Sequence, residues 1–352
     1  MKTDNPFSLD FGAKPNLYIP RLEEQNRIIS TFSSTKPSSH IFMLIGARGT
    51  GKTVLMTSIS HELRNNAGWL HIDLGNGSDV LNSLAAYLVK ESKILFPKLK
   101  FDITVKGLGI SVDKDEKYSD ITADLDTMIH TLNRKNVKIL VTVDEVSNSK
   151  GIRDFMTYYQ HCIREEMDIF VLMTGLYKNI RALQNNKTLT FLKRVPKIIL
   201  EPLNLMRISK KYEDIFDLDR DSSMKMAYHT SGYSYGFQIL GYILYDSGKN
   251  VIDDNVLSEY ITCLEENSYE KIWEELSAEE RRVAISIAKM DTVPDVKDVR
   301  DDLDMNSNKF STYKDTLTKS GILSDKKARG KVGFNLPYFK EFVIRQSQIE
   351  YL

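Results

Sequence analysis

Apolar and polar positions along the chain form blocks that predict strands and helices in turn. Five apolar runs have the length and composition of buried strands: 41–45, 68–74, 137–146, 168–175 and 195–203. Between these runs, apolar residues recur at helical spacing from residue 53 onward and in the segments 78–93, 120–136 and 152–166. Strands that alternate with helices predict an α/β fold, a parallel sheet with helices on both faces.

The pattern changes after about residue 267, where short helical blocks are expected. The first, 277–290, starts with Ser277 and Glu280 in capping-box spacing. The segment 294–305 follows, and a third block ends at Gly321, a residue type typical of the position just after a helix. Two short strand-like runs then flank a turn at residues 328–330. Three helices and a hairpin are similar to a winged helix-turn-helix. A further hairpin is predicted at residues 101–113.

Composition adds few constraints. The chain has 352 residues, with 48 Lys and Arg balancing 48 Asp and Glu, so net charge favours no particular partner. No apolar run reaches the ~18 residues of a membrane span, and the N-terminus lacks the apolar segment of a secretory signal. Cys162 and Cys263 lie far apart without metal-site spacing, which favours free thiols in a cytoplasmic protein.

The segment "GARGTGKT", between the first strand and the helix that follows it, fits the phosphate-loop pattern G-x-x-x-x-G-K-[ST]. Glycines let backbone N–H groups converge on phosphate oxygens, and the helix N-terminus adds partial positive charge. Lysine would reach the β- and γ-phosphates of ATP, and the threonine hydroxyl would bind Mg²⁺. The predicted nucleotide-binding residues are Gly46, Ala47, Arg48, Gly49, Thr50, Gly51, Lys52 and Thr53.

A second acidic motif follows the strand 137–146. Asp144 is placed to support Mg²⁺, and Glu145 to polarise an attacking water, which suits hydrolysis. Acids are also common where loops begin. Thr174, at the end of the next strand, could position the water or be an ordinary strand-end threonine.

With these elements placed, the chain resembles AAA+ ATPases, in particular prokaryotic ATP-binding proteins related to origin-recognition initiators and STAND signalling ATPases. The segment "YIPRLEEQNRIISTF" is similar to their adenine-covering segment, although Pro20 replaces the usual glycine and only Arg21 carries over. The segment "TFLKRVPKIILEPLN" resembles the one that carries an arginine finger. The resemblance makes Arg194 the candidate, ahead of Lys193, and implies a homo-oligomer or a partner protein.

The segment 230–248 resembles the lid helix of these families, but it lacks the arginine that usually senses the nucleotide there. Tyr235 and Gln238 are candidates to face the nucleotide, or they pack the lid. This departure favours slow, switch-like turnover over fast motor cycling.

Local charge bears on nucleic-acid binding. Residues 267–304 hold 6 Lys and Arg against 11 Asp and Glu, whereas residues 305–345 hold 9 against 3. The segment expected to enter a DNA groove is thus the basic one. The predicted DNA contacts are Lys309, Lys314, Lys326, Lys327, Arg329 and Lys331, with Lys319 in the same basic segment. Lysine-rich surfaces are also often only solvated, and winged helices also bind proteins.

Together these observations predict an AAA+-like domain at 1–203, a helical lid at 204–266 and a winged helix at 267–352. The expected function is slow ATP hydrolysis, with Mg²⁺, that controls assembly and binding to double-stranded DNA. One alternative is a STAND-like switch whose winged helix docks on protein. A P-loop kinase is the other, and Glu145, the lid and the C-terminal module argue against it.

Overall fold

A computed structural model describes residues 4–10, 15–77, 79–95, 121–324 and 330–349. The chain forms two compact units. The sheet unit comprises Arg21–Leu44 and Leu55–Ile198, and the helical unit comprises Met1–Pro20, Ile45–Val54 and Ile199–Leu352. The phosphate loop, by its contacts, therefore belongs to the helical unit.

Five strands form one sheet in the order β2-β3-β4-β1-β5. β2 pairs in parallel with β3, and β3 pairs in parallel with β4. The strands confirm the five predicted apolar runs: β1 (Ile41–Ile45), β2 (Trp69–Leu74), β3 (Lys138–Val143), β4 (Ile169–Gly175) and β5 (Lys197–Ile199). Every residue of β1 and β4 is buried, because helices cover both faces of the sheet.

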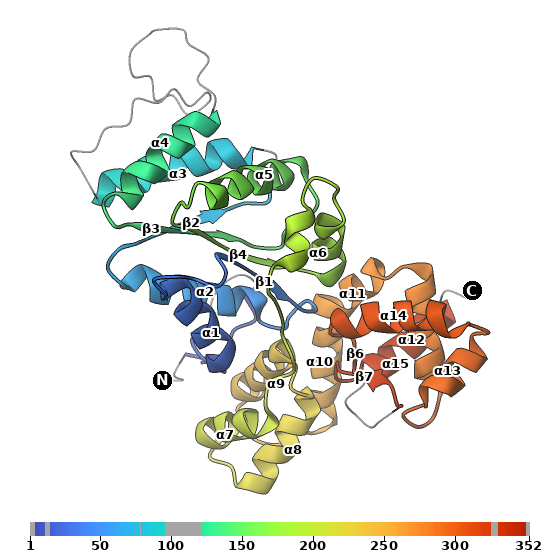
Figure 1. Cartoon of the computed structure of the whole chain (residues 1–352). Helices are drawn as coiled ribbons and strands as arrows, with labels where there is room; N and C mark the ends of the chain where they lie inside the picture. Colours follow the sequence, from blue (N-terminus) through green and yellow to red (C-terminus); the bar gives the residue numbers. More distant parts are fainter. Residues whose placement is uncertain (1–3, 11–14, 78, 96–120, 325–329, 350–352) are drawn as a thin grey trace. The chain divides into compact units, whose positions relative to one another are not determined.

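The helices of the sheet unit alternate with these strands. Figure 1 shows α3, α4 and α5 on one face of the sheet and α1 and α2 on the other. Their bounds are α1 (Leu22–Ser33), α2 (Lys52–Asn65), α3 (Val80–Leu95), α4 (Ile121–Asn133), α5 (Lys150–Arg164), α6 (Tyr177–Gln184) and the 3-10 helix η1 (Thr190–Arg194). Phe32, Phe42 and Phe170 meet in the core, with ring centroids of Phe32 and Phe170 5.1 Å apart. The predicted α/β fold is confirmed.

After β5 the chain enters a run of helices with side-chain caps. The bounds are α7 (Leu205–Phe216), α8 (Arg220–Thr230), α9 (Ser234–Ser247), α10 (Asp254–Leu264), the π-helix η2 (Glu265–Tyr269) and α11 (Glu270–Glu275). Asn204, Asp219 and Asp253 accept backbone N–H groups at the starts of α7, α8 and α10. These caps satisfy donors that a helix start leaves unpaired.

The C-terminal part begins at the predicted capping box, which is confirmed at Ser277 and Glu280. It contains α12 (Ala278–Lys289), α13 (Val296–Asp302), α14 (Ser307–Lys319), β6 (Leu323–Ser324), β7 (Gly333–Phe334) and α15 (Phe339–Ile349). Gly321 follows α14 with a φ of +80°, as predicted for a glycine at a helix end. β6 and β7 are antiparallel. The sequence did not predict α15, although Phe339, Phe342 and Val343 recur at helical spacing and are buried.

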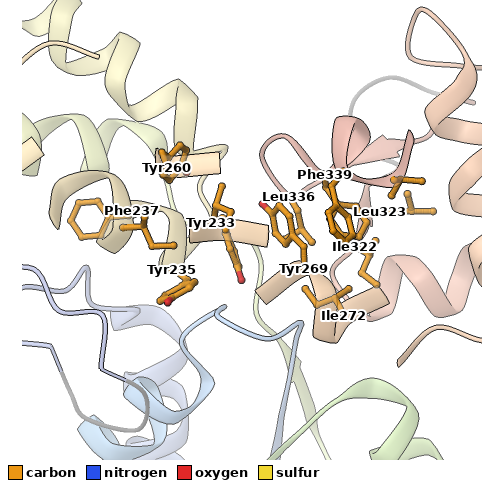
Figure 2. Close-up of a cluster of buried hydrophobic side chains, with 14 of the residues drawn as sticks. Tyr233, Tyr235, Phe237, Tyr260, Tyr269, Ile272, Ile322, Leu323, Leu336 and Phe339 are labelled. Atoms are coloured by element: carbon orange, nitrogen blue, oxygen red, sulfur yellow. The ribbon is translucent and has the colours of Figure 1, made fainter. Parts of the chain in front are cut away.

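One hydrophobic core runs through the helical unit from α7 to α15. Figure 2 shows Phe237 and Tyr260 on one side of it and Tyr269 and Phe339 on the other, with Tyr233 between them. The rings of Tyr269 and Phe339 meet edge to face at 5.0 Å. The helices on either side of residue 267 therefore share their packing.

The predicted hairpin at 101–113 and the predicted turn at 328–330 fall wholly or largely outside the described residues. Within the described part, no helix is long and apolar enough to cross a membrane. Both cysteines are free thiols, Cys162 buried and Cys263 half-buried.

Candidate nucleotide-binding site

The phosphate loop follows β1 and leads into α2, and its shape depends on two glycines. Gly49 and Gly51 have φ values of +71° and +88°, a backbone conformation that residues other than glycine rarely adopt. An added Cβ at Gly49 would also lie 2.2 Å from the hydroxyl of Tyr233. Glycine is therefore required at position 49 by the backbone and by close packing, and at position 51 by the backbone.

Three successive carbonyls of the loop are hydrogen-bonded to the start of α9. The hydroxyl of Tyr233 donates to Arg48 O at 2.8 Å, the N–H of Tyr235 to Gly49 O at 3.0 Å, and the hydroxyl of Ser234 to Thr50 O at 3.1 Å. In a trans peptide, the carbonyl and the following N–H point in opposite directions. Binding these carbonyls on one side thus directs the N–H groups of residues 49–51 to the other, as a phosphate cradle requires.

Burial keeps the tyrosine anchor neutral. Tyr233 is 4% exposed, and desolvation raises the pKa of its hydroxyl, which therefore stays a donor. Its hydroxyl also shares a hydrogen bond of 2.7 Å with the hydroxyl of Ser268.

Lys52 is buried and turned back on its own loop. Its ammonium donates to Gly46 O at 3.1 Å and to Ala47 O at 2.8 Å. The same donors would transfer to phosphate oxygens on nucleotide binding. Thr53 is half-buried at the start of α2.

Arg48, predicted to bind the nucleotide, has its guanidinium on a carboxylate. Its Nε and Nη2 both donate to one oxygen of Glu275, at 3.0 and 2.7 Å. Glu275 ends α11, within the same helical unit. The structure therefore gives this side chain a partner that the sequence did not predict.

In the sheet unit, Asp144, Glu145 and Thr174 meet at the carboxyl ends of β3 and β4. The hydroxyl of Thr174 donates to Asp144. The backbone N–H of Glu145 donates to Thr174 Oγ1 at 3.0 Å and to Asp144 Oδ1 at 3.1 Å. Glu145 adopts a φ of +49°, a left-handed conformation that is costly for a residue with a Cβ and often occurs at functional sites.

Asn76, which lies just after β2, also belongs to this site, although no motif in the sequence marks it. Its amide donates to Glu145 O at 2.8 Å, and its Oδ1 accepts from the hydroxyls of Ser147 and Ser149. Asn76 thereby holds the loop that carries Glu145. Its position, a polar side chain just past the carboxyl end of a parallel strand, was the signal available in the sequence.

The structure also shows the surroundings of Arg21, from the adenine-covering segment, and of Arg194 and Lys193, from the arginine-finger segment. Arg21 is largely buried and lies 3.9 Å from the carboxylate of Glu24. Arg194 and Lys193 are exposed at the end of η1. Their predicted roles toward nucleotide and partner stay predictions.

The lid candidates Tyr235 and Gln238 both make contacts within the helical unit. Tyr235 binds the loop through its backbone, and burial raises the pKa of its side chain to about 12. The amide of Gln238 donates to Leu17 O at 2.7 Å and accepts from the N–H of Ser8 at 3.1 Å. Gln238 therefore secures the N-terminal segment to α9.

The donor chemistry fits magnesium. Thr53 and Asp144, the predicted ligands, offer a hydroxyl and a carboxylate, and Mg²⁺ binds oxygen atoms from few side chains together with phosphates. Among the described residues, no cluster of three His, Cys, Asp or Glu side chains could hold a metal on its own.

Of the predicted DNA contacts, Lys309, Lys314 and Lys331 are described, and Lys326, Lys327 and Arg329 lie outside the described residues. Lys309 is 3.4 Å from Glu279, and Lys331 is 3.9 Å from Asp295. Lys314 is half-exposed on α14. Both ion pairs lie at the surface, where such pairs are weak.

Solved structures share this architecture over nearly the whole chain. The Walker-type ATPase PABY2304 of Pyrococcus abyssi has a TM-score of 0.60 and 13% identity, covering 94% of this chain and 96% of its own. The ORC2 protein of Aeropyrum pernix, solved as ADPNP-ADP complexes, has a TM-score of 0.58 and 12% identity, covering 97% of this chain and 98% of its own. The chain has the AAA+ P-loop fold.

A family model matches one part of the chain in sequence. Residues 266–343 match the family "Domain of unknown function (DUF8462)". No curated protein matches the chain in sequence. The matched segment contains both Glu275 and Gly321, which approach the phosphate loop.

Proposed function

We propose that this protein binds ATP with Mg²⁺, hydrolyses it slowly, and uses the nucleotide state to control assembly and DNA binding. The observation that carries the proposal is the phosphate loop, whose carbonyls at residues 48–50 are bound by α9 so that its N–H groups face the other way. The structural similarity to an ORC2 protein solved with ADPNP and ADP supports the same ligand class.

In this proposal the motif residues divide the work. Lys52 moves its ammonium from the loop carbonyls to the phosphates, while the hydroxyl of Thr53 and the carboxylate of Asp144 hold Mg²⁺. Bound Mg²⁺ neutralises charge on the phosphates. Glu145 activates water, and Thr174 positions Asp144 and the Glu145 backbone.

DNA contact is assigned to the basic segment 305–345, which contains 9 Lys and Arg but only 3 Asp and Glu. Phosphate neutralisation by lysines requires such local charge asymmetry and gives binding that weakens steeply with salt. α14 has no Arg, Asn or Gln after Asn308, so its side chains are poorly suited to bidentate contacts with bases. We therefore expect binding that depends little on DNA sequence.

Assembly is assigned to Arg194. Its exposed position at the end of η1 leaves the guanidinium accessible to a neighbouring subunit. In that role the guanidinium would stabilise transition-state charge on a nucleotide bound to the neighbouring subunit.

The first experiment tests nucleotide binding and turnover. Mant-ATP fluorescence should show binding by the wild type and its loss in Lys52→Ala. Lys187→Ala, at an exposed lysine outside the loop, should bind as the wild type does. Phosphate release without any added acceptor, lost in Glu145→Gln, would support hydrolysis. Binding without release would instead favour the kinase alternative.

The second experiment tests DNA binding and its dependence on nucleotide. Fluorescence anisotropy on random duplex DNA would be measured with ADP, and with ATP in Glu145→Gln, across a salt series. Binding that depends on nucleotide and falls steeply with salt supports the proposal. Absence of binding in both states, while mant-ATP still binds, would favour the switch that docks on protein.

A further inference from the structure

Arg48 occupies a variable position of the phosphate-loop motif, and its guanidinium is paired with Glu275. Both N–H groups that bind Glu275 converge on one carboxylate oxygen, at 3.0 and 2.7 Å. The two side chains are 31% and 24% exposed, so this ion pair is screened less than one on an open surface. A residue of the loop is thus joined to the last residue of α11.

The same helical stretch also holds the backbone of Arg48. Tyr233 donates to Arg48 O and shares its hydroxyl with Ser268 at 2.7 Å. Ser268 lies in the π-helical turn η2, between α10 and α11. Such turns are rare and often lie at functional sites. Arg48 is therefore held at its carbonyl, through Tyr233, and at its guanidinium by residues 268–275.

Gly321, just after α14, also lies near the loop. An added Cβ at Gly321 would lie 3.4 Å from the backbone nitrogen of Ala47 and 3.6 Å from its Cβ. Gly321, two residues beyond the end of α14, thus lies close to the phosphate loop. Ala47 is also the residue whose carbonyl accepts from Lys52, at 2.8 Å.

These observations place two residues of the family-matched segment 266–343, Glu275 and Gly321, next to the phosphate loop. Phosphate binding would draw Lys52 off the carbonyls of Gly46 and Ala47, and the peptide next to Ala47 carries Arg48. A shift there changes the two contacts that come from residues 266–343, the Glu275 ion pair and the Gly321 packing.

We propose that Arg48 and Glu275 form a latch that holds residues 266–343 against the phosphate loop and opens when the loop binds nucleotide phosphates. The domain of unknown function is then the part of the chain that reads the nucleotide state. This inference rests on the proposed ATP binding and adds the regulation of that site.

Hydrogen–deuterium exchange on the full chain tests the latch. Peptides covering residues 270–276 and 307–324 would be followed with and without a saturating, slowly hydrolysed ATP analogue and Mg²⁺. In the wild type, nucleotide should speed exchange in both segments by about two- to fivefold, the ratio expected when a partly exposed ion pair is lost. Glu275→Gln should exchange that fast without nucleotide and respond no further.

Two variants control the test. Glu274→Gln removes a charge from the neighbouring, exposed residue of α11 and should respond to nucleotide as the wild type does. The exchanged pair, Arg48→Glu with Glu275→Arg, should restore slow exchange without nucleotide, because the attraction is restored with its signs reversed. Glu275→Gln keeps the side-chain volume, so the fold should be retained.

Mant-ATP binding measured in parallel distinguishes failure of the latch from failure of the proposed ATP binding. If the wild type binds mant-ATP but exchange in both segments is unchanged, the latch is wrong and ATP binding stands. If Glu275→Gln still responds to nucleotide like the wild type, the ion pair does not take part in the response and the latch is wrong. If no nucleotide binds at all, the proposed function fails and the latch fails with it.

Discussion

The hydroxyl of Tyr233, at the start of α9, donates a 2.8 Å hydrogen bond to the backbone carbonyl of Arg48 in the phosphate loop. The two residues are 185 positions apart in sequence, and Tyr233 is almost fully buried. The bond fixes the orientation of the peptide between Arg48 and Gly49, and hence the direction of the N–H group that would bind phosphate.

Tyr233→Phe removes this hydroxyl, so the Arg48 carbonyl and the Ser268 hydroxyl each lose their hydrogen bond to it. An unsatisfied buried polar group costs ~1–3 kcal/mol, so we expect that loss in the free energy of unfolding, measured in urea. Mant-ATP affinity should fall as well. Tyr228→Phe, at a position 63% exposed on α8, should change neither. Wild-type affinity in Tyr233→Phe would show that the loop keeps its shape without this anchor.

Gly49→Ala should be far more damaging than Gly75→Ala. At Gly49 the backbone has a φ of +71° and a new Cβ would lie 2.2 Å from Tyr233 Oη, whereas at Gly75 nothing lies within 4 Å. We expect Gly49→Ala to abolish mant-ATP binding and lower the melting temperature, with Gly75→Ala close to wild type in both. Equal behaviour of the two variants would contradict the packing of the loop on α9.

The sequence predicted the strands, the phosphate loop and the Asp144 motif because these features are local. Strand length, helical spacing and motif spacing do not depend on distant residues. The partners of Arg48 could not be predicted in this way. Glu275 lies 227 residues away, and nothing in its local sequence distinguishes it from the exposed Glu274 beside it.

Long-range contacts also explain why the sequence did not indicate the hydrogen-bond partners of Gln238 and Asn76. Gln238 was considered for the nucleotide, but its amide pairs with Leu17 and Ser8, more than two hundred residues distant. Asn76 became a site residue only through its bond to Glu145, 69 residues away. The sequence showed that these side chains were polar and near strand or helix ends, and the fold determined which groups they meet.

Thr174→Val should lower ATP hydrolysis more than ATP binding. Valine keeps the shape but removes the hydroxyl that donates to Asp144 and accepts from the Glu145 N–H. We expect phosphate release to fall by about 10- to 100-fold, because misplaced catalytic groups cost rate of that order. Thr174→Ser keeps the hydroxyl and should retain most activity. If valine and serine are equally active, Thr174 is an ordinary strand-end residue.

Asn76→Asp removes one donor while keeping the acceptor. The carboxylate can still accept from Ser147 and Ser149 but cannot donate to Glu145 O, and two oxygens then face each other. The turnover number should fall while mant-ATP affinity stays unchanged, since the loop of Glu145 is freed but the phosphate loop is untouched. Asn66→Asp, exposed after α2, serves as the charge control. A rise in Kd without a change in turnover would contradict the role given to Asn76.

Stability should decline as the pH falls below about 6.5, through the half-buried histidines His40 and His71. Burial lowers the pKa of both from the ordinary value of 6.5, although the carboxylates of Asp168 and Asp73 oppose the shift. The unfolded chain therefore takes up protons at a higher pH than the folded chain does, so the stability present above 6.5 is lost as the pH falls toward the folded pKa values. Urea unfolding at about pH 8 and pH 5.5 measures the loss, and His71→Gln, whose amide can replace the 2.9 Å bond to Thr142, should reduce it. Equal unfolding free energies at the two pH values in the wild type would show that these rings titrate alike in the folded and unfolded chain.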